Sequence, residues 1–245
     1  MSANLNQKKE IQTLLGLPKS LYYPNLAEQV LCIEAELQID KTSLVLDIGA
    51  GSGNIANGLT SISKCQILAV DTDKSPKLNS HICWIQTDFL QKIPVLRELD
   101  AAYWVAPYIG DGWFDGSFER LIKEFGMNIK PGGRFLIDLF NFAHKEIGKQ
   151  KEIIEPQMGG RAWYKRTSID KYEGRRIFDN GSQDHVLIWR IFEQSELIDI
   201  FKEAGFKLVH KLDSFGSNLS SETQRVIDYK KYKRDIYIFE KFNKA

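Results

Sequence analysis

Apolar segments of strand length alternate with amphipathic segments of helical length along most of the chain. The segments that we expect to form strands are residues 42–48, 65–71, 80–87, 99–107, 133–140, 206–215 and 235–242. The segments that we expect to form helices are residues 23–37, 54–62, 116–129 and 195–205. Strands and helices that alternate in this way are typical of a mostly parallel sheet with helices on both faces.

Two of the helical segments carry recognisable end signals. Residues 23–37 place apolar side chains at helical spacing, with Asn25 as the expected N-cap. Residues 195–205 begin with Ser195 as the expected N-cap and end with Gly205 as the expected C′ glycine. The segment 116–129 has a single apolar face, which is formed by Phe118, Leu121, Ile122 and Phe125.

The alternation of strands and helices breaks between about residues 151 and 190. This stretch has strand-like alternation of polar and apolar residues, and Asn180–Gly181 is a dipeptide typical of a tight β-turn. We therefore expect an inserted antiparallel β element. It carries both aromatic and basic side chains, namely Trp163, Tyr164, Tyr172 and Trp189 among Arg161, Lys165, Arg166 and Arg175.

Composition and charge are those of an ordinary globular domain. The chain has 245 residues, of which 43% are hydrophobic and 27% are charged, so a disordered or fibrous chain is not expected. Its 33 Lys and Arg residues nearly balance its 32 Asp and Glu residues, and the formal net charge is +1. Such a charge provides no broad electrostatic surface for a nucleic-acid duplex, so we expect no nucleic-acid partner.

Other functional classes are disfavoured by simple features of the sequence. No apolar run approaches the roughly 18 residues of a membrane helix, and residues 1–15 lack the apolar core of a signal peptide. We therefore expect a cytoplasmic protein with no membrane partner. The cysteines Cys32, Cys65 and Cys83 show no C-x-x-C spacing, and the four histidines do not cluster with them, so we expect no bound metal.

The first strand leads into a glycine-rich turn with the sequence DIGAGSG, residues 47–53. A strand that delivers such a turn to a helix N-terminus lets a ligand lie against bare backbone. The dinucleotide fingerprint G-x-G-x-x-G does not fit, because Asn54 replaces the last glycine of a pattern that begins at Gly49. Asp47, just before the first glycine, would clash with a pyrophosphate but suits a ligand with a cationic amino-acid end.

The segment VLDIGAGSGNIA, residues 45–56, resembles motif I of the Rossmann-like, class I S-adenosylmethionine-dependent methyltransferases. Matches to three further family features follow in order: AVDTD at 69–73, QTDF at 86–89 and IKPGGRFLIDLF at 129–140, where Ile129 replaces the usual leucine. EAGF at 203–206 is also frequent in the family. The resemblance extends over roughly residues 23–206 and is looser outside the glycine-rich motif.

The resemblance implies that S-adenosylmethionine is the methyl donor. Asp71 is then the acid that holds the ribose hydroxyls, and Asp88 lies near the adenine amino group with Phe89 beside the ring. The alternatives are a structural carboxylate at a strand end for Asp71 and a helix cap for Asp88. The donor-binding residues that we expect are Tyr23, Asp47, Gly49, Ala50, Gly51, Gly53, Asp71, Thr72, Asp88, Phe89 and Val105.

The fourth strand ends in Val105-Ala106-Pro107-Tyr108, at the edge where open α/β sheets bind their ligands. DNA-adenine and glutamine methyltransferases carry Asn/Asp-Pro-Pro-Tyr/Phe at this place, and Ala106 lacks the polar side chain of that motif. Nucleobase and glutamine acceptors are therefore disfavoured. An aromatic block suggests an apolar acceptor pocket, although some of its members could belong to the core; it comprises Tyr103, Trp104, Tyr108, Trp113 and Phe114.

Candidate catalytic residues follow the ends of the fourth and fifth strands. His144 lies just past the fifth strand and is the best-placed candidate for a general base. The alternative is that His144 is an exposed loop residue with no catalytic role. Tyr108 is the second catalytic candidate. The insertion enters on the ligand side of the sheet, so we expect it to cover the acceptor as a lid. The alternative is a solvated hairpin that extends the sheet.

These observations predict a three-layer Rossmann-like α/β domain with a mostly parallel seven-stranded sheet and an antiparallel insertion before the sixth strand. We expect one methyltransferase domain over residues 1–245, with a helical cap at 1–40 and the lid at 151–190. The expected reaction is methyl transfer to a nitrogen or oxygen of a small molecule. Alternatives are a peptide, protein or carrier-bound acceptor, a non-catalytic subunit with this fold, and a nicotinamide oxidoreductase, which Asn54 disfavours.

Overall fold

The computed structural model describes residues 26–74, 76, 78–91, 98–141, 145–155, 160–178, 185–213, 215 and 233–242. The expected N-terminal cap at 1–40 is therefore described only from Leu26 onward. Among these residues, no helix is both long enough and apolar enough to span a membrane.

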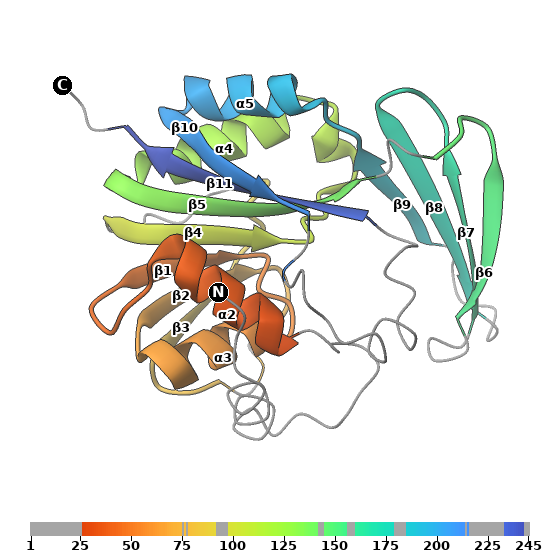
Figure 1. Cartoon of the computed structure of the whole chain (residues 1–245). Helices are drawn as coiled ribbons and strands as arrows, with labels where there is room; N and C mark the ends of the chain where they lie inside the picture. The colour runs from red at the N-terminus through yellow and green to blue at the C-terminus, as the bar shows by residue number, and fades with distance from the viewer. Residues whose placement is uncertain are drawn as a thin grey trace.

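A seven-stranded sheet forms the centre of the molecule (Figure 1). Its strands lie in the order β10-β11-β5-β4-β1-β2-β3. Six strands are parallel to one another, and β11 is antiparallel to both of its neighbours. The strands are β1 (Leu44–Ile48), β2 (Gln66–Asp71), β3 (Ile82–Gln86), β4 (Leu99–Val105), β5 (Ile129–Asn141), β10 (Phe206–Leu212) and β11 (Lys233–Lys241). The predicted seven-stranded, mostly parallel sheet is confirmed.

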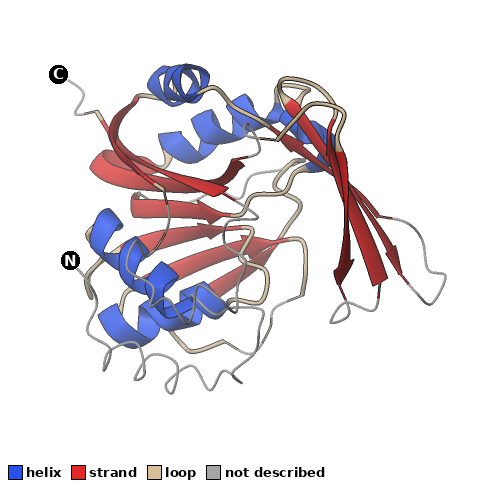
Figure 2. Ribbon diagram, turned by 45° about the vertical axis from the view of Figure 1, so that its right-hand side comes forward, coloured by secondary structure: helices blue, strands red, loops and turns tan. Residues whose placement is uncertain are grey.

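Helices cover both faces of this sheet and complete three layers (Figure 2). One face packs against α2 (Leu26–Leu37) and α3 (Asn54–Ser63), and the other against α4 (Ser117–Met127) and α5 (Gln194–Glu203). A short 3-10 helix, η1 (Gly110–Trp113), precedes α4. The apolar face predicted for α4 is fully buried, because Phe118, Leu121, Ile122 and Phe125 have no exposed surface.

The insertion forms a second, four-stranded antiparallel sheet in the order β6-β7-β8-β9, seen to the right of the central sheet in Figure 1. Its strands are β6 (Gln150–Glu155), β7 (Gly160–Arg166), β8 (Lys171–Phe178) and β9 (His185–Arg190). The predicted antiparallel insertion is thus confirmed, and it is a separate sheet rather than an extension of the central one. The expected turn at Asn180–Gly181 lies outside the described residues.

Two local expectations differ from the structure. Helix α5 begins at Gln194, and its N-cap is Glu193, so the expected N-cap at Ser195 is wrong. Segment 130–133, expected as a turn before the fifth strand, lies inside β5 as a bulge: Ile129 pairs with Leu99, whereas Arg134 already pairs with Ala101. The C-terminal end of α5 is as predicted, because Gly205 has a φ of 85°.

Candidate functional site

The glycine-rich turn after β1 depends on backbone conformations that favour glycine. Gly49, Gly51 and Gly53 all have positive φ, at 66°, 54° and 69°. A Cβ atom on Gly53 would also lie 2.6 Å from a methyl carbon of Leu78, so any other residue here would require Leu78 to move. Helix α3 starts directly after Gly53 and has no side-chain cap, so the turn brings the first amides of the helix to the ligand side of the sheet.

The Asp71 carboxylate at the end of β2 holds this turn in place. Its Oδ2 accepts a hydrogen bond of 2.7 Å from the backbone amide of Gly51, and its Oδ1 accepts one of 2.9 Å from the amide of Asp73. The side chain is 9% exposed. The Thr72 hydroxyl also donates to Oδ1, at 3.4 Å. Asp71 is therefore a structural carboxylate, and its Oδ2 still has a lone pair available for a ligand hydroxyl.

Asp47 is buried behind the turn, beside Tyr103 of β4. Its Oδ2 and the Tyr103 hydroxyl have no hydrogen-bond partner among the described residues. Burial raises the pKa of Asp47 to about 7, and the negative charge of Asp71 adds to this shift. A cation close to Asp47 would therefore stabilise its ionised form.

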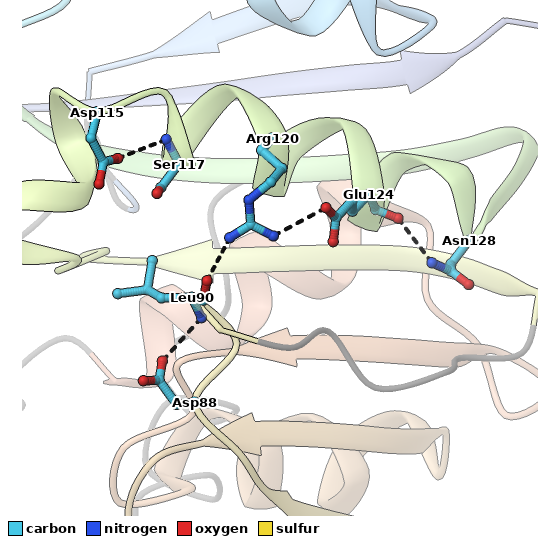
Figure 3. A network of polar contacts seen from close by, with 7 residues as sticks. All are labelled: Asp88, Leu90, Asp115, Ser117, Arg120, Glu124 and Asn128. Atoms are coloured by element: carbon cyan, nitrogen blue, oxygen red, sulfur yellow. Dashed lines mark hydrogen bonds and ion pairs between the residues drawn. The ribbon is translucent and has the colours of Figure 1, made fainter.

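The Asp88 carboxylate organises the turn that follows β3 (Figure 3). Its Oδ1 accepts a hydrogen bond from the amide of Leu90 at 3.0 Å, and its Oδ2 accepts one from the Gln91 side chain at 2.8 Å. Phe89, between these residues, packs edge-on against Trp104 with ring centroids 5.8 Å apart. Asp88 thus caps the turn at residues 89–91; residues 92–97, where a helix would continue, lie outside the described residues.

A cavity of about 220 Å³ lies where the carboxyl ends of β1 to β4 meet. This volume is somewhat smaller than the roughly 300 Å³ at which typical small-molecule sites begin. Seven of the residues predicted for the donor site or for catalysis line it: Gly49, Asp71, Thr72, Asp88, Phe89, Val105 and Tyr108. Ala50, Gly51 and Gly53 belong to the adjoining turn, and Asp47 lies buried behind it.

Four lining residues were not among the predicted site residues, namely Leu90, Trp104, Ala106 and Pro107. Ala106 has a φ of 51°, a left-handed conformation that costs a residue with a side chain roughly 1–2 kcal/mol. Such strain is concentrated at functional sites. The sequence does contain one indication that Ala106 and Pro107 belong to the site, which is their position directly after β4.

The aromatic block after β4 divides between the core and the surface. Tyr103, Trp104 and Trp113 are at most 1% exposed, whereas Tyr108 is 46% and Phe114 is 41% exposed. The block therefore divides as the alternative allowed, with Tyr103 in the core. Only Trp104 and Tyr108 reach the cavity, because Tyr103 and Trp113 pack against helices on opposite faces of the sheet.

Tyr108 connects the cavity to the inserted sheet. Its hydroxyl donates a hydrogen bond of 3.2 Å to the backbone carbonyl of Val186 in β9, and its ring lies 6.1 Å from that of Trp189. Partial burial raises the pKa of Tyr108, so the hydroxyl stays protonated near neutral pH. Tyr108 therefore lines the cavity and contacts the inserted sheet at the same time.

The inserted sheet carries an aromatic cluster next to Tyr108. Tyr164, Tyr172 and Trp189 have ring centroids 6.2 Å from one another. Gly174 makes room for them, because a Cβ atom there would lie 2.7 Å from the Tyr164 ring. This packing gives the insertion a small apolar core of its own.

Arg190, at the end of β9, anchors the insertion to the central domain. Its guanidinium donates hydrogen bonds to the carbonyl oxygen of Trp113 at 3.0 Å and to Glu119 at 2.7 Å, and it also pairs with Glu196. It lies 4.7 Å from the centroid of the Phe192 ring. The Arg190 side chain therefore connects the end of β9 to η1, α4 and α5.

Several predicted residues cannot be placed at the site. Tyr23 and His144 lie outside the described residues. Two histidines that were not predicted for the site do not line the cavity: His210 Nε2 lies 2.9 Å from a carboxylate oxygen of Glu36, and the His81 ring contacts the Gln66 side chain. Within the part of the chain that the structure describes, no group of three His, Cys, Asp or Glu residues could hold a metal ion.

No protein-family model matches the chain. A sterol 24-C-methyltransferase from Debaryomyces hansenii is 24% identical over 153 residues, which is 56% of this chain. The match spans only 40% of the length of that relative.

Solved structures match over nearly the whole chain. A S-adenosylmethionine-dependent methyltransferase from Clostridium acetobutylicum has a TM-score of 0.63 at 13% identity, covering 97% of this chain and 99% of its own. The 1,6-didemethyltoxoflavin-N1-methyltransferase from Burkholderia thailandensis, solved with its substrate and S-adenosylhomocysteine, has a TM-score of 0.56 at 15% identity, covering 99% and 94%. The resemblance found in the sequence is thus confirmed for the fold: this chain has the fold of the class I S-adenosylmethionine-dependent methyltransferases.

Proposed function

We propose that the chain is a methyltransferase that binds S-adenosylmethionine in the cavity at the ends of β1 to β4. The Asp71 carboxylate accepts the ribose hydroxyls, and Asp88 accepts the adenine amine with Phe89 beside the ring. The glycine-rich turn and Asp47 receive the amino-acid end, with Asp47 acting on the cationic amine directly or through water. Thr72 and Val105 complete the walls.

The distribution of charge in the cavity carries this proposal. Asp71 and Asp88 line it, and none of the lining residues that the structure describes is a Lys or Arg. Asp47 is buried close enough for the charge of Asp71 to contribute to its raised pKa. Carboxylates in this arrangement repel the pyrophosphate of a dinucleotide and attract a sulfonium and an ammonium group. The same arrangement counts against the nicotinamide alternative.

The chemistry requires alignment more than acid–base assistance. When bound, S-adenosylmethionine supplies a methyl group already activated on a sulfonium. An acceptor lone pair forms the new bond to the methyl carbon while the carbon–sulfur bond breaks, and that electron pair leaves on sulfur. The residues of the chain hold the two reactants in line and exclude water.

The acceptor in this proposal is a nitrogen or oxygen of a small molecule. Tyr108 borders both the cavity and the insertion, which supports a site between them with the insertion, residues 151–190, as its lid. The whole chain then acts as a single domain. The toxoflavin methyltransferase with the same fold acts on a small molecule, which favours this class of acceptor. His144 remains the candidate base for a hydroxyl acceptor.

Calorimetry with S-adenosylhomocysteine and NAD tests the donor assignment. We expect S-adenosylhomocysteine to bind at least about a hundredfold more tightly, which is roughly 2.7 kcal/mol. Tighter binding of NAD would contradict the proposal. A panel of small amines, phenols and alcohols, monitored by release of S-adenosylhomocysteine, then identifies the acceptor.

A further inference from the structure

Helix α4 contacts the Asp88 turn through the side chain of Arg120 (Figure 3). Arg120 donates through Nη2 to the carbonyl oxygen of Leu90 at 2.6 Å, and through Nη1 to Glu124 at 3.0 Å. The amide of Leu90 donates to Asp88. A continuous set of hydrogen bonds thus runs from the outer helix to a carboxylate that lines the cavity.

The same turn is also attached by apolar contacts. The Phe89 ring packs against Phe125 of α4, with centroids 6.2 Å apart, and against Trp104 of β4. A Cβ atom on Gly112 would lie 3.3 Å from the Leu90 side chain. These contacts keep the turn near α4 even without Arg120. What Arg120 adds is the orientation of the Leu90 carbonyl.

The orientation of this turn controls what Asp88 can recognise. Both carboxylate oxygens of Asp88 already accept one hydrogen bond from within the turn. Each oxygen has two lone pairs, so only the remaining pair of each is available to a ligand. The direction in which those lone pairs point depends on the conformation of the turn, which the contacts with α4 fix.

We propose that Arg120 is a positioning residue that aims Asp88 at an amino group and so selects adenine over a purine with a carbonyl oxygen at that place. This inference rests on the proposed function. The Arg120 side chain is 38% exposed, so its loss leaves a carbonyl that water can reach. Its planar guanidinium suits the task, because separate N–H groups serve Leu90 and Glu124 at once.

The test compares binding of S-adenosylhomocysteine and S-inosylhomocysteine, which carries a carbonyl oxygen in place of the adenine amine. We expect the wild-type protein to prefer the adenine compound at least about tenfold, as for one hydrogen bond to a charged group. Arg120→Met should reduce this preference to about threefold or less, and Arg120→Lys should restore much of it. The control is Lys123→Met, which removes an exposed cation from the same helix and should leave the preference unchanged.

The ratio of the two affinities separates positioning from a general structural effect. If Arg120→Met lowers the melting temperature or weakens both ligands equally, with the preference intact, Arg120 does not position Asp88 and the inference is wrong. A wild-type protein that binds neither compound overturns the proposed function and this inference together. Wild-type binding with equal affinity for both compounds overturns the inference alone.

Discussion

The Asp71 carboxylate accepts a hydrogen bond of 2.7 Å from the backbone amide of Gly51, twenty residues away in the sequence. This contact joins the end of β2 to the glycine-rich turn after β1. The residue that we propose as the ribose acceptor therefore also shapes the turn beside it. In this proposal, donor binding and the shape of the turn depend on the same carboxylate, so substitutions of Asp71 should affect both.

Replacing Asp71 by Ala removes the acceptor of the Gly51 amide and the charged partner of the ribose. Hydrogen bonds to charged groups are worth roughly 1.5–3 kcal/mol, so affinity for S-adenosylhomocysteine should fall about ten- to a hundredfold. The melting temperature of the ligand-free protein should also fall. Calorimetry and thermal unfolding measure the two effects. Asp73→Asn, which removes an exposed carboxylate two residues away, is the control; an equal loss of affinity there would contradict a specific role for Asp71.

Asp47→Asn should make the ligand-free protein more stable at pH 8 than the wild type, with a smaller difference at pH 5. The folded pKa of Asp47 is raised to about 7, so the folded state binds its proton more tightly than the unfolded state. The stabilising contribution of the protonated acid is full below about pH 4 and is lost as the pH rises to about 7. Thermal unfolding between pH 4 and 8 measures this. If the stability of the two proteins changed with pH in the same way, the folded pKa of Asp47 would not be raised.

Tyr108→Phe tests whether the hydroxyl or the ring of Tyr108 contributes to the site. The pKa of Tyr108 is raised and its hydroxyl donates to the Val186 carbonyl, so we expect no role as a base. Turnover of an acceptor from the panel should retain its pH profile, whereas Tyr108→Ala should raise the acceptor KM. Loss of kcat in Tyr108→Phe with normal donor binding would make the hydroxyl catalytic.

Arg190→Met should loosen the insertion without disturbing the donor site. The substitution leaves Glu119 and Glu196 without the cation between them, and we expect a loss of about 1–3 kcal/mol in unfolding free energy. Urea unfolding measures this loss. Because Arg190 does not line the cavity, affinity for S-adenosylhomocysteine should stay within about twofold while the acceptor KM rises. An unchanged acceptor KM would place the acceptor away from the inserted sheet; Lys202→Met, on exposed α5 surface, is the control.

The order of strands and helices along the chain, the glycine-rich turn, and the acids at the end of β2 and after β3 could all be predicted from the sequence. These features depend on local physics: the period of apolar residues, the backbone freedom of glycine and the position of a side chain at a strand end. The carboxyl ends of parallel strands meet at one edge, so the meeting of Asp71 and Asp88 at one cavity could also be predicted.

The positions of the side chains beyond those strand ends could not be predicted and became known from the three-dimensional structure. Trp113 belongs to the same aromatic stretch as Tyr108, yet Trp113 is buried and Tyr108 lines the cavity. Tyr108 bonds to Val186 across 78 positions, and Arg190 reaches Glu119 across 71. Such contacts depend on how the inserted sheet docks, and docking is set by packing between distant segments that leaves no periodic signal in the sequence.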